Sequence, residues 1–175
     1  MNNTAVNKKL SIKMQTVYAL VATAAAVALP QIFHLFGAIG GETWLPMHLP
    51  VLMVGFLAGP VAGAFAGALS PIVSFALSGM PSVALLPFMV IELMVYGLCA
   101  GLLKDVKMPS ILKVLASQVA GRAVRAVFIL AAFYMGNSTI APAIIWNSIV
   151  AGLAGIILQL IFIPAILKIA ERKLK

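Results

Sequence analysis

Charged residues are scarce in this sequence. Only 9% of the 175 residues are Asp, Glu, Lys or Arg, whereas 63% are hydrophobic. In soluble domains about a quarter of the residues are charged, so water cannot be the solvent for most of this surface. The apolar runs also lack the alternation of apolar and polar residues that is typical of a membrane β-barrel. The sequence therefore predicts an all-α fold, namely a polytopic protein built of transmembrane helices.

Cysteine and catalytic motifs are also missing. The single cysteine, Cys99, lies in an apolar run, which excludes a disulfide framework and a cysteine metal site. The sequence contains no Walker A loop, no HExxH and no GxSxG motif. We therefore predict that the chain is not an enzyme and needs no cofactor. The chain alone is therefore not expected to hydrolyse ATP.

Acidic residues are fewer than basic ones, with 4 Asp or Glu against 12 Lys or Arg and a formal net charge of +8. Nucleic-acid binding would require a basic face on a folded soluble domain, so we expect no nucleic-acid partner. The basic residues instead form three clusters: Lys8, Lys9 and Lys13; Lys104, Lys107 and Lys113; Lys168, Arg172, Lys173 and Lys175. The positive-inside rule places all three clusters in the cytoplasm.

Turn residues and charges divide the chain into six apolar segments, at roughly 15–36, 46–59, 61–79, 84–104, 110–135 and 141–170. The second segment is shorter than the about 20 residues of a spanning helix, so it predicts a short or tilted helix. The connections at 37–45, 79–84 and 136–141 contain no Lys or Arg and are expected outside. We predict one domain, residues 1–175, with six transmembrane helices, both termini cytoplasmic, and multi-pass insertion in the plasma membrane of a prokaryote.

Small residues recur at intervals of four, which allows helices to approach closely. They include Gly55, Gly59, Gly63 and Gly67, the pair Gly97 and Gly101, and the pair Ala22 and Ala26 in the first segment. The glycines are expected to pack inside the bundle. For the alanines two roles stay open, since a smooth helix face can pack internally or meet another protein.

Three charged residues fall inside apolar segments, where each is costly unless it is paired or functional. Glu92 is in the fourth segment, and Arg122 and Arg125 stand one turn apart in the fifth. At about 1.5 Å per residue, Glu92 lies about 12 Å and Arg125 about 15 Å from the outer ends of their helices, so they can meet at one depth. A structural ion pair explains Glu92 and one arginine. The second arginine leaves a surplus positive charge that an anionic ligand can meet.

Three further residues are candidates for the outer half of the molecule. Asn147 has an amide that both donates and accepts hydrogen bonds. Trp44 is expected either to anchor the chain at the membrane surface or to cover a pocket. His48 has no second metal-binding residue at ligand spacing, so we expect a structural or ligand-contacting role and no metal site.

Several stretches resemble the S-component of an energy-coupling factor (ECF) transporter. They are the alanine-rich first helix, Leu45-Pro46-Met47-His48-Leu49-Pro50-Val51-Leu52 with the following Gly55 and Gly59-Pro60, Leu77-Ser78-Gly79-Met80-Pro81, and Glu92-Leu93-Met94-Val95-Tyr96-Gly97-Leu98. Together with the six-segment plan, the resemblance covers nearly the whole chain.

The resemblance implies a membrane protein that binds a vitamin or vitamin precursor from outside. It also implies docking on a transmembrane coupling protein with two ATPase subunits, through small residues of the first helix that map onto Ala22 and Ala26, with Ala19 as an alternative register. The implied substrate pocket maps onto Trp44, Glu92, Arg122, Arg125 and Asn147.

The substrate and the class of transporter both have alternatives. Surplus arginine favours an acidic ligand, and pantothenate is the first guess. Glu92 could instead bind a ring nitrogen of a pyridoxine-like, pyrimidine or deazapurine precursor. The competing class is a self-sufficient secondary transporter that acts as a homodimer, with Glu92 as a proton relay.

Overall fold

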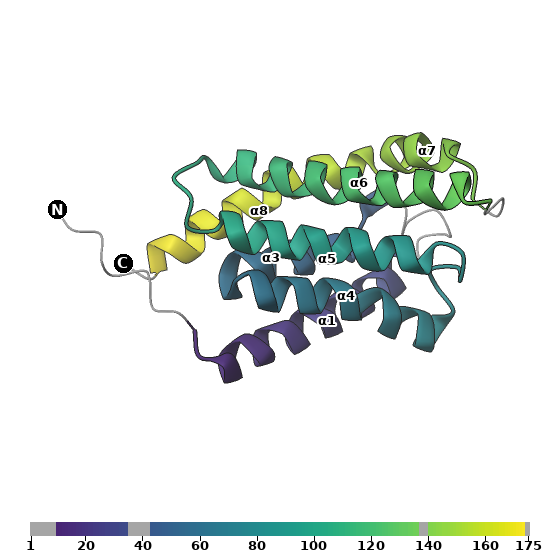
Figure 1. The fold of residues 1–175 in the computed structure, drawn as a ribbon. Helices are drawn as coiled ribbons and strands as arrows, with labels where there is room; N and C mark the ends of the chain where they lie inside the picture. The colour runs from purple at the N-terminus through teal and green to yellow at the C-terminus, as the bar shows by residue number, and fades with distance from the viewer. Residues whose placement is uncertain (1–9, 35–42, 137–139, 174–175) are drawn as a thin grey trace.

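The computed structural model describes residues 10–34, 43–136 and 140–173, and these residues form a bundle of α-helices (Figure 1). The helices are α1 (Ile12–His34), α3 (His48–Ala58), α4 (Pro60–Ser78), α5 (Leu86–Leu103), α6 (Ser110–Tyr134), α7 (Ala143–Ala151) and α8 (Leu153–Lys173). Within the described residues there is no strand, so the predicted all-α class is confirmed.

Each of the six predicted apolar segments contains helix. By length and composition, α1, α4, α5 and α6 can each cross a membrane, and α3, with 11 residues, is the short helix that the sequence predicts. The sixth segment is not one continuous helix. It is divided into α7 and α8, which meet at an angle of 53° and together can form a fifth candidate span.

Glycines at this bend allow another segment to approach closely. Gly152 lies between α7 and α8, where a Cβ atom would come within 2.9 Å of the Leu45 side chain. A Cβ on Gly155, in the first turn of α8, would come within 2.5 Å of the Trp44 backbone carbonyl oxygen. The segment that leads into α3 therefore presses closely on the α7–α8 junction, and larger residues there would displace it.

Glycines also hold α3, α4 and α5 together, as predicted. A Cβ atom on Gly63 of α4 or on Gly97 of α5 would collide with the backbone of the other residue, and one on Gly67 would collide with the backbone of Leu93. Gly55 of α3 likewise lies against the carbonyl of Gly97. Such backbone contact is typical of membrane helix pairs, which lack a hydrophobic driving force between them.

The two alanines of α1 for which the sequence leaves two roles open, Ala22 and Ala26, pack inside the bundle. Ala22 is 8% exposed and Ala26 is fully buried. Ala22 packs with Ala62 and Ala66 of α4, among others. The exposed face of α1 lies on the opposite side of the helix, because residues two positions apart in a helix point in nearly opposite directions. That face carries Val17, Leu20, Val21, Ala24 and Ala28.

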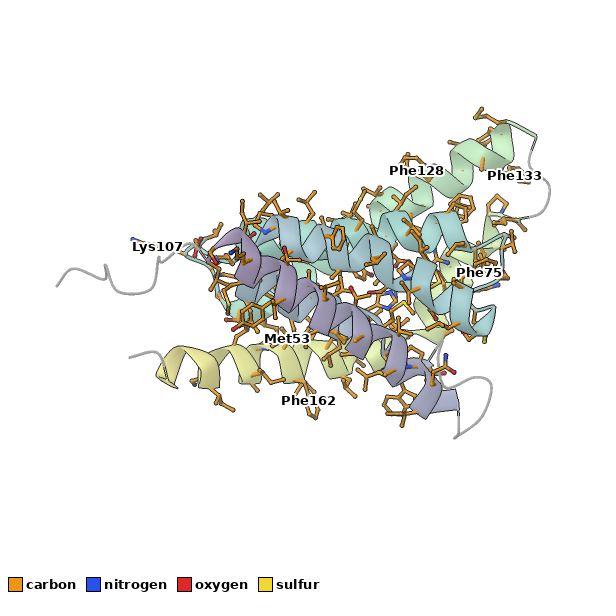
Figure 2. All side chains as sticks on the ribbon, turned by 90° about the horizontal axis from the view of Figure 1, so that it is seen from below. Met53, Phe75, Lys107, Phe128, Phe133 and Phe162 are labelled. Carbon is orange, nitrogen blue, oxygen red and sulfur yellow. The ribbon has the colours of Figure 1, made fainter. Side chains whose placement is uncertain are left out.

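The outer surface separates apolar from basic side chains. Large apolar residues such as Phe128 and Phe162, 47% and 54% exposed, point away from the bundle (Figure 2). The described lysines lie at one end, where α1 and α6 begin and α5 and α8 end. Those whose side chains the structure describes are Lys13, Lys104, Lys107, Lys113 and Lys168. The described helix ends at the opposite end of the bundle carry neither Lys nor Arg.

Candidate functional site

A cavity of about 470 Å³ lies toward the end of the bundle that lacks Lys and Arg. It is lined by the last part of α1, the segment that leads into α3, the turn between α4 and α5, the first half of α5, and parts of α4, α6 and α7. Most of its wall is apolar, with Met, Pro, Leu and Ile side chains, while a few polar and charged groups converge on it. Small-molecule sites have this composition.

Glu92 is the acidic group of the cavity and is 1% exposed. Its Oε2 accepts a hydrogen bond of 2.9 Å from Nη1 of Arg125, and its Oε1 accepts one of 3.1 Å from the Tyr96 hydroxyl. Nε2 of His48 lies 3.9 Å from the same Oε1. The predicted meeting of Glu92 with one arginine at a common depth is thus confirmed, and Arg125 is that arginine.

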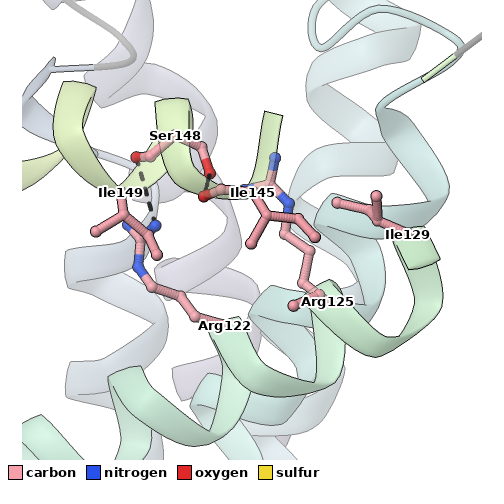
Figure 3. Close-up of a pocket in the computed structure, with 7 residues that line it drawn as sticks. Arg122, Arg125, Ile129, Ile145, Ser148 and Ile149 are labelled. Atoms are coloured by element: carbon pink, nitrogen blue, oxygen red, sulfur yellow. Dashed lines mark hydrogen bonds between the residues drawn. The ribbon is translucent and has the colours of Figure 1, made fainter. Parts of the chain in front are cut away.

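Arg122 has a different environment. Figure 3 shows Arg122 and Arg125 extending from α6 toward α7, where Nη1 of Arg122 donates a long hydrogen bond of 3.4 Å to the Ser148 carbonyl oxygen. In the described part of the chain no carboxylate lies within ion-pair distance of Arg122. Its guanidinium therefore brings a positive charge to the cavity that Glu92 does not neutralise.

Three nitrogen atoms of cavity-lining side chains are buried without a hydrogen-bond partner among the described residues. They are Nε of Arg122, Nε of Arg125 and Nδ1 of His48. Buried polar groups in proteins are nearly always paired, with protein, water or ligand. Their concentration around one cavity indicates that a polar molecule fits there.

A second buried polar chain supports the wall of the cavity. Nε2 of Gln118 on α6 donates to Oε1 of Gln159 on α8 at 2.9 Å, and Nε2 of Gln159 donates to the Leu45 carbonyl oxygen at 3.2 Å. Leu45 lines the cavity and has a left-handed backbone, with φ of 47°. The two glutamines thus connect α6 and α8 to the segment before α3, and they fix a strained residue.

Four of the five predicted site residues line this cavity, namely Glu92, Arg122, Arg125 and Asn147. The fifth, Trp44, is not among the lining residues, and its side chain is 41% exposed. The Trp44 backbone packs against Gly155 and directly precedes Leu45, which lines the cavity. Its role as a substrate contact stays a prediction.

Sequence reasoning missed Tyr96 and Gln159, and it left the role of His48 undecided. Tyr96 stands four residues after Glu92 on the same helix, a spacing that could have revealed the contact. Gln159 is a lone polar residue in an apolar run, which is itself a signal of a buried partner. The contact between His48 and Glu92 joins two different helices, so no spacing within one segment of the sequence could have predicted it.

A helical membrane protein that gathers an acid and two arginines around a cavity of this size has the features of a protein that binds a small polar solute within the membrane. Comparison with known families agrees, since residues 13–167 match the family described as "ECF transporter, substrate-specific component". The chain therefore belongs to the S-component family of ECF transporters and is a multi-pass membrane protein, as the resemblance predicted. No curated protein and no solved structure matches the chain.

Proposed function

We propose that this chain is the substrate-specific subunit of an ECF-type ABC importer whose ligand is a vitamin or vitamin precursor with one acidic group. The observation that carries the proposal is Arg122, a cavity-lining cation without a carboxylate partner in the described residues. Glu92 and Arg125 neutralise each other, so the described residues that line the cavity carry one surplus positive charge. An unpaired buried charge is costly, and a ligand carboxylate removes that cost through a charge-assisted hydrogen bond.

Pantothenate remains the first guess among such acids. It carries one carboxylate, which suits a surplus of one positive charge, and a volume of about 470 Å³ is in the range of small-molecule sites. Asn147 on α7 is proposed to bind a polar group of the ligand because it lines the cavity beside Ser148. Trp44 is proposed to contact the ligand from the rim, next to Leu45.

The proposed topology has six membrane crossings with both ends in the cytoplasm. It counts the short α3 as one crossing and the bent α7–α8 pair as another. The grouping of Lys13, Lys104, Lys107, Lys113 and Lys168 at one end supports a cytoplasmic location of that end. The cavity then opens toward the outside, where an importer meets its substrate, in a prokaryotic plasma membrane.

The proposed partners are a transmembrane coupling protein and two ATPase subunits, which would supply the energy. Ala22 and Ala26 pack inside the bundle. We therefore propose that the coupling protein contacts the opposite, exposed side of α1. Ala24 and Ala28 are exposed there at a spacing of four and leave room for a partner helix.

Uptake of radiolabelled pantothenate tests this function. Cells should accumulate it when this chain is produced together with a coupling protein and both ATPases, and should lose accumulation when the ATPases carry an inactive Walker A lysine. Uptake that needs only this chain and a proton gradient would contradict the proposal and favour the secondary transporter.

A further inference from the structure

His48 is a buried polar residue that the proposed function does not yet use. It is the first residue of α3, is 3% exposed and lines the cavity. Its ring packs against Tyr96, with ring centroids 5.2 Å apart at 57°. Nδ1 is buried and has no hydrogen-bond partner among the described residues. A group of this kind requires an explanation, since an unpaired buried nitrogen lowers stability.

The neighbouring carboxylate decides which ring nitrogen carries the proton. Nε2 lies 3.9 Å from Oε1 of Glu92, too far for a hydrogen bond but close enough for a clear electrostatic preference. A proton on Nε2 faces the carboxylate favourably, whereas a lone pair there would be repelled. Arg122 and Arg125 already bring two positive charges to the cavity, so a neutral ring avoids a third. In this tautomer Nδ1 is a hydrogen-bond acceptor.

We propose that His48 is a ligand-binding residue whose Nδ1 accepts a hydrogen bond from a hydroxyl or amide N–H of the substrate. This inference rests on the proposed function, because it assumes that the cavity holds the transported molecule. Arg122 then selects the acidic group and His48 selects a separate donor group. The substrate class is a small monocarboxylic acid with at least one hydroxyl or N–H group apart from the acid.

The alternative is that His48 only supports Glu92 and Tyr96, with water at Nδ1. Asparagine and glutamine separate the two roles. The Asn side-chain oxygen can take a position near Nδ1 and preserve an acceptor for the ligand, whereas the longer Gln places its amide near Nε2 and preserves a polar group beside Glu92. The two variants are matched in polarity, so a difference between them reports which nitrogen matters.

The experiment measures dissociation constants by calorimetry for the full-length purified protein with four monocarboxylates. Pantothenate and biotin carry hydroxyl or N–H donors, while lipoate and nicotinate carry none apart from the acid. We expect pantothenate or biotin to bind more tightly than lipoate and nicotinate. Binding of the donor-bearing acid should weaken by about 5-fold to 100-fold in His48→Phe and His48→Gln, and should be retained best in His48→Asn. Binding of an acid without a donor should change least.

The outcomes separate the two proposals. Failure of all four acids to bind the wild-type protein would overturn the proposed function, and this inference with it. Unchanged binding of pantothenate or biotin in His48→Phe, or better retention in His48→Gln than in His48→Asn, would overturn the role of Nδ1 and leave the proposed function intact. If His48→Phe does not fold, the comparison of Asn with Gln decides the matter alone.

Discussion

Replacing Arg125 with Met measures the stability that the buried ion pair contributes. Glu92 is 1% exposed, and its Oε2 is 2.9 Å from Nη1 of Arg125. Removing one partner of such a pair leaves an uncompensated charge and costs about 3–5 kcal/mol. In a chain of this length each kcal/mol changes the melting temperature by about 2–4 °C. Ligand-free Arg125→Met should therefore melt about 6–20 °C below the wild type.

A second substitution tests the cause of this loss. Glu92→Gln removes the charge that Arg125→Met leaves unpaired, so the double variant should recover much of the melting temperature. Arg122→Met is the matched control, because Arg122 has only a 3.4 Å bond to a carbonyl oxygen and should lower the melting temperature less. The assay is thermal unfolding of detergent-solubilised, ligand-free protein, followed by intrinsic fluorescence. Equal destabilisation by both arginine variants, or no recovery in the double variant, would refute this division of roles.

Three other predictions concern packing, coupling and topology. Gly97→Ala should lower the melting temperature strongly, because the added Cβ meets the backbone of α4; a neutral effect would show that α4 and α5 are not in contact. Ala24→Trp should abolish uptake but leave ligand binding intact, whereas Ala26→Trp should destabilise the protein, and the opposite pattern would restore the original assignment of the α1 face. In a background without the native cysteine, Ser82→Cys should react with an impermeant reagent from outside and Lys107→Cys should not; reversed labelling would invert the topology.

The sequence was sufficient for features that depend on composition and local periodicity. Apolar segments located the helices. The positions of Glu92 and Arg125 along their helices predicted that the two side chains lie at the same depth in the membrane, and they form an ion pair. The division of roles between the arginines was not predictable, because one helical turn separates them and only packing decides which one reaches Glu92. The close packing of the segment around Leu45 against the α7–α8 junction joins residues far apart in the sequence, and no local pattern encodes it.

The face of α1 could not be assigned for a related reason. Alanines occupy 22, 24, 25, 26 and 28, so the helix presents small residues in almost every direction. An amphipathic pattern normally distinguishes buried from exposed positions, but a helix in lipid is apolar on both faces. Only packing in the bundle shows that both alanines point inward: Ala22 clusters with residues of α4, and Ala26 clusters with residues of α3 and α5.

Native mass spectrometry of the gently purified protein tests most directly whether the cavity holds an acid at Arg122. The wild-type protein should retain one small molecule with a single acidic group, and Arg122→Met should lose it, since removing a charged hydrogen-bonding partner typically lowers affinity by about 30-fold to several thousand-fold. A neutral or cationic bound molecule, or an acid that Arg122→Met retains at the same occupancy, would contradict the account.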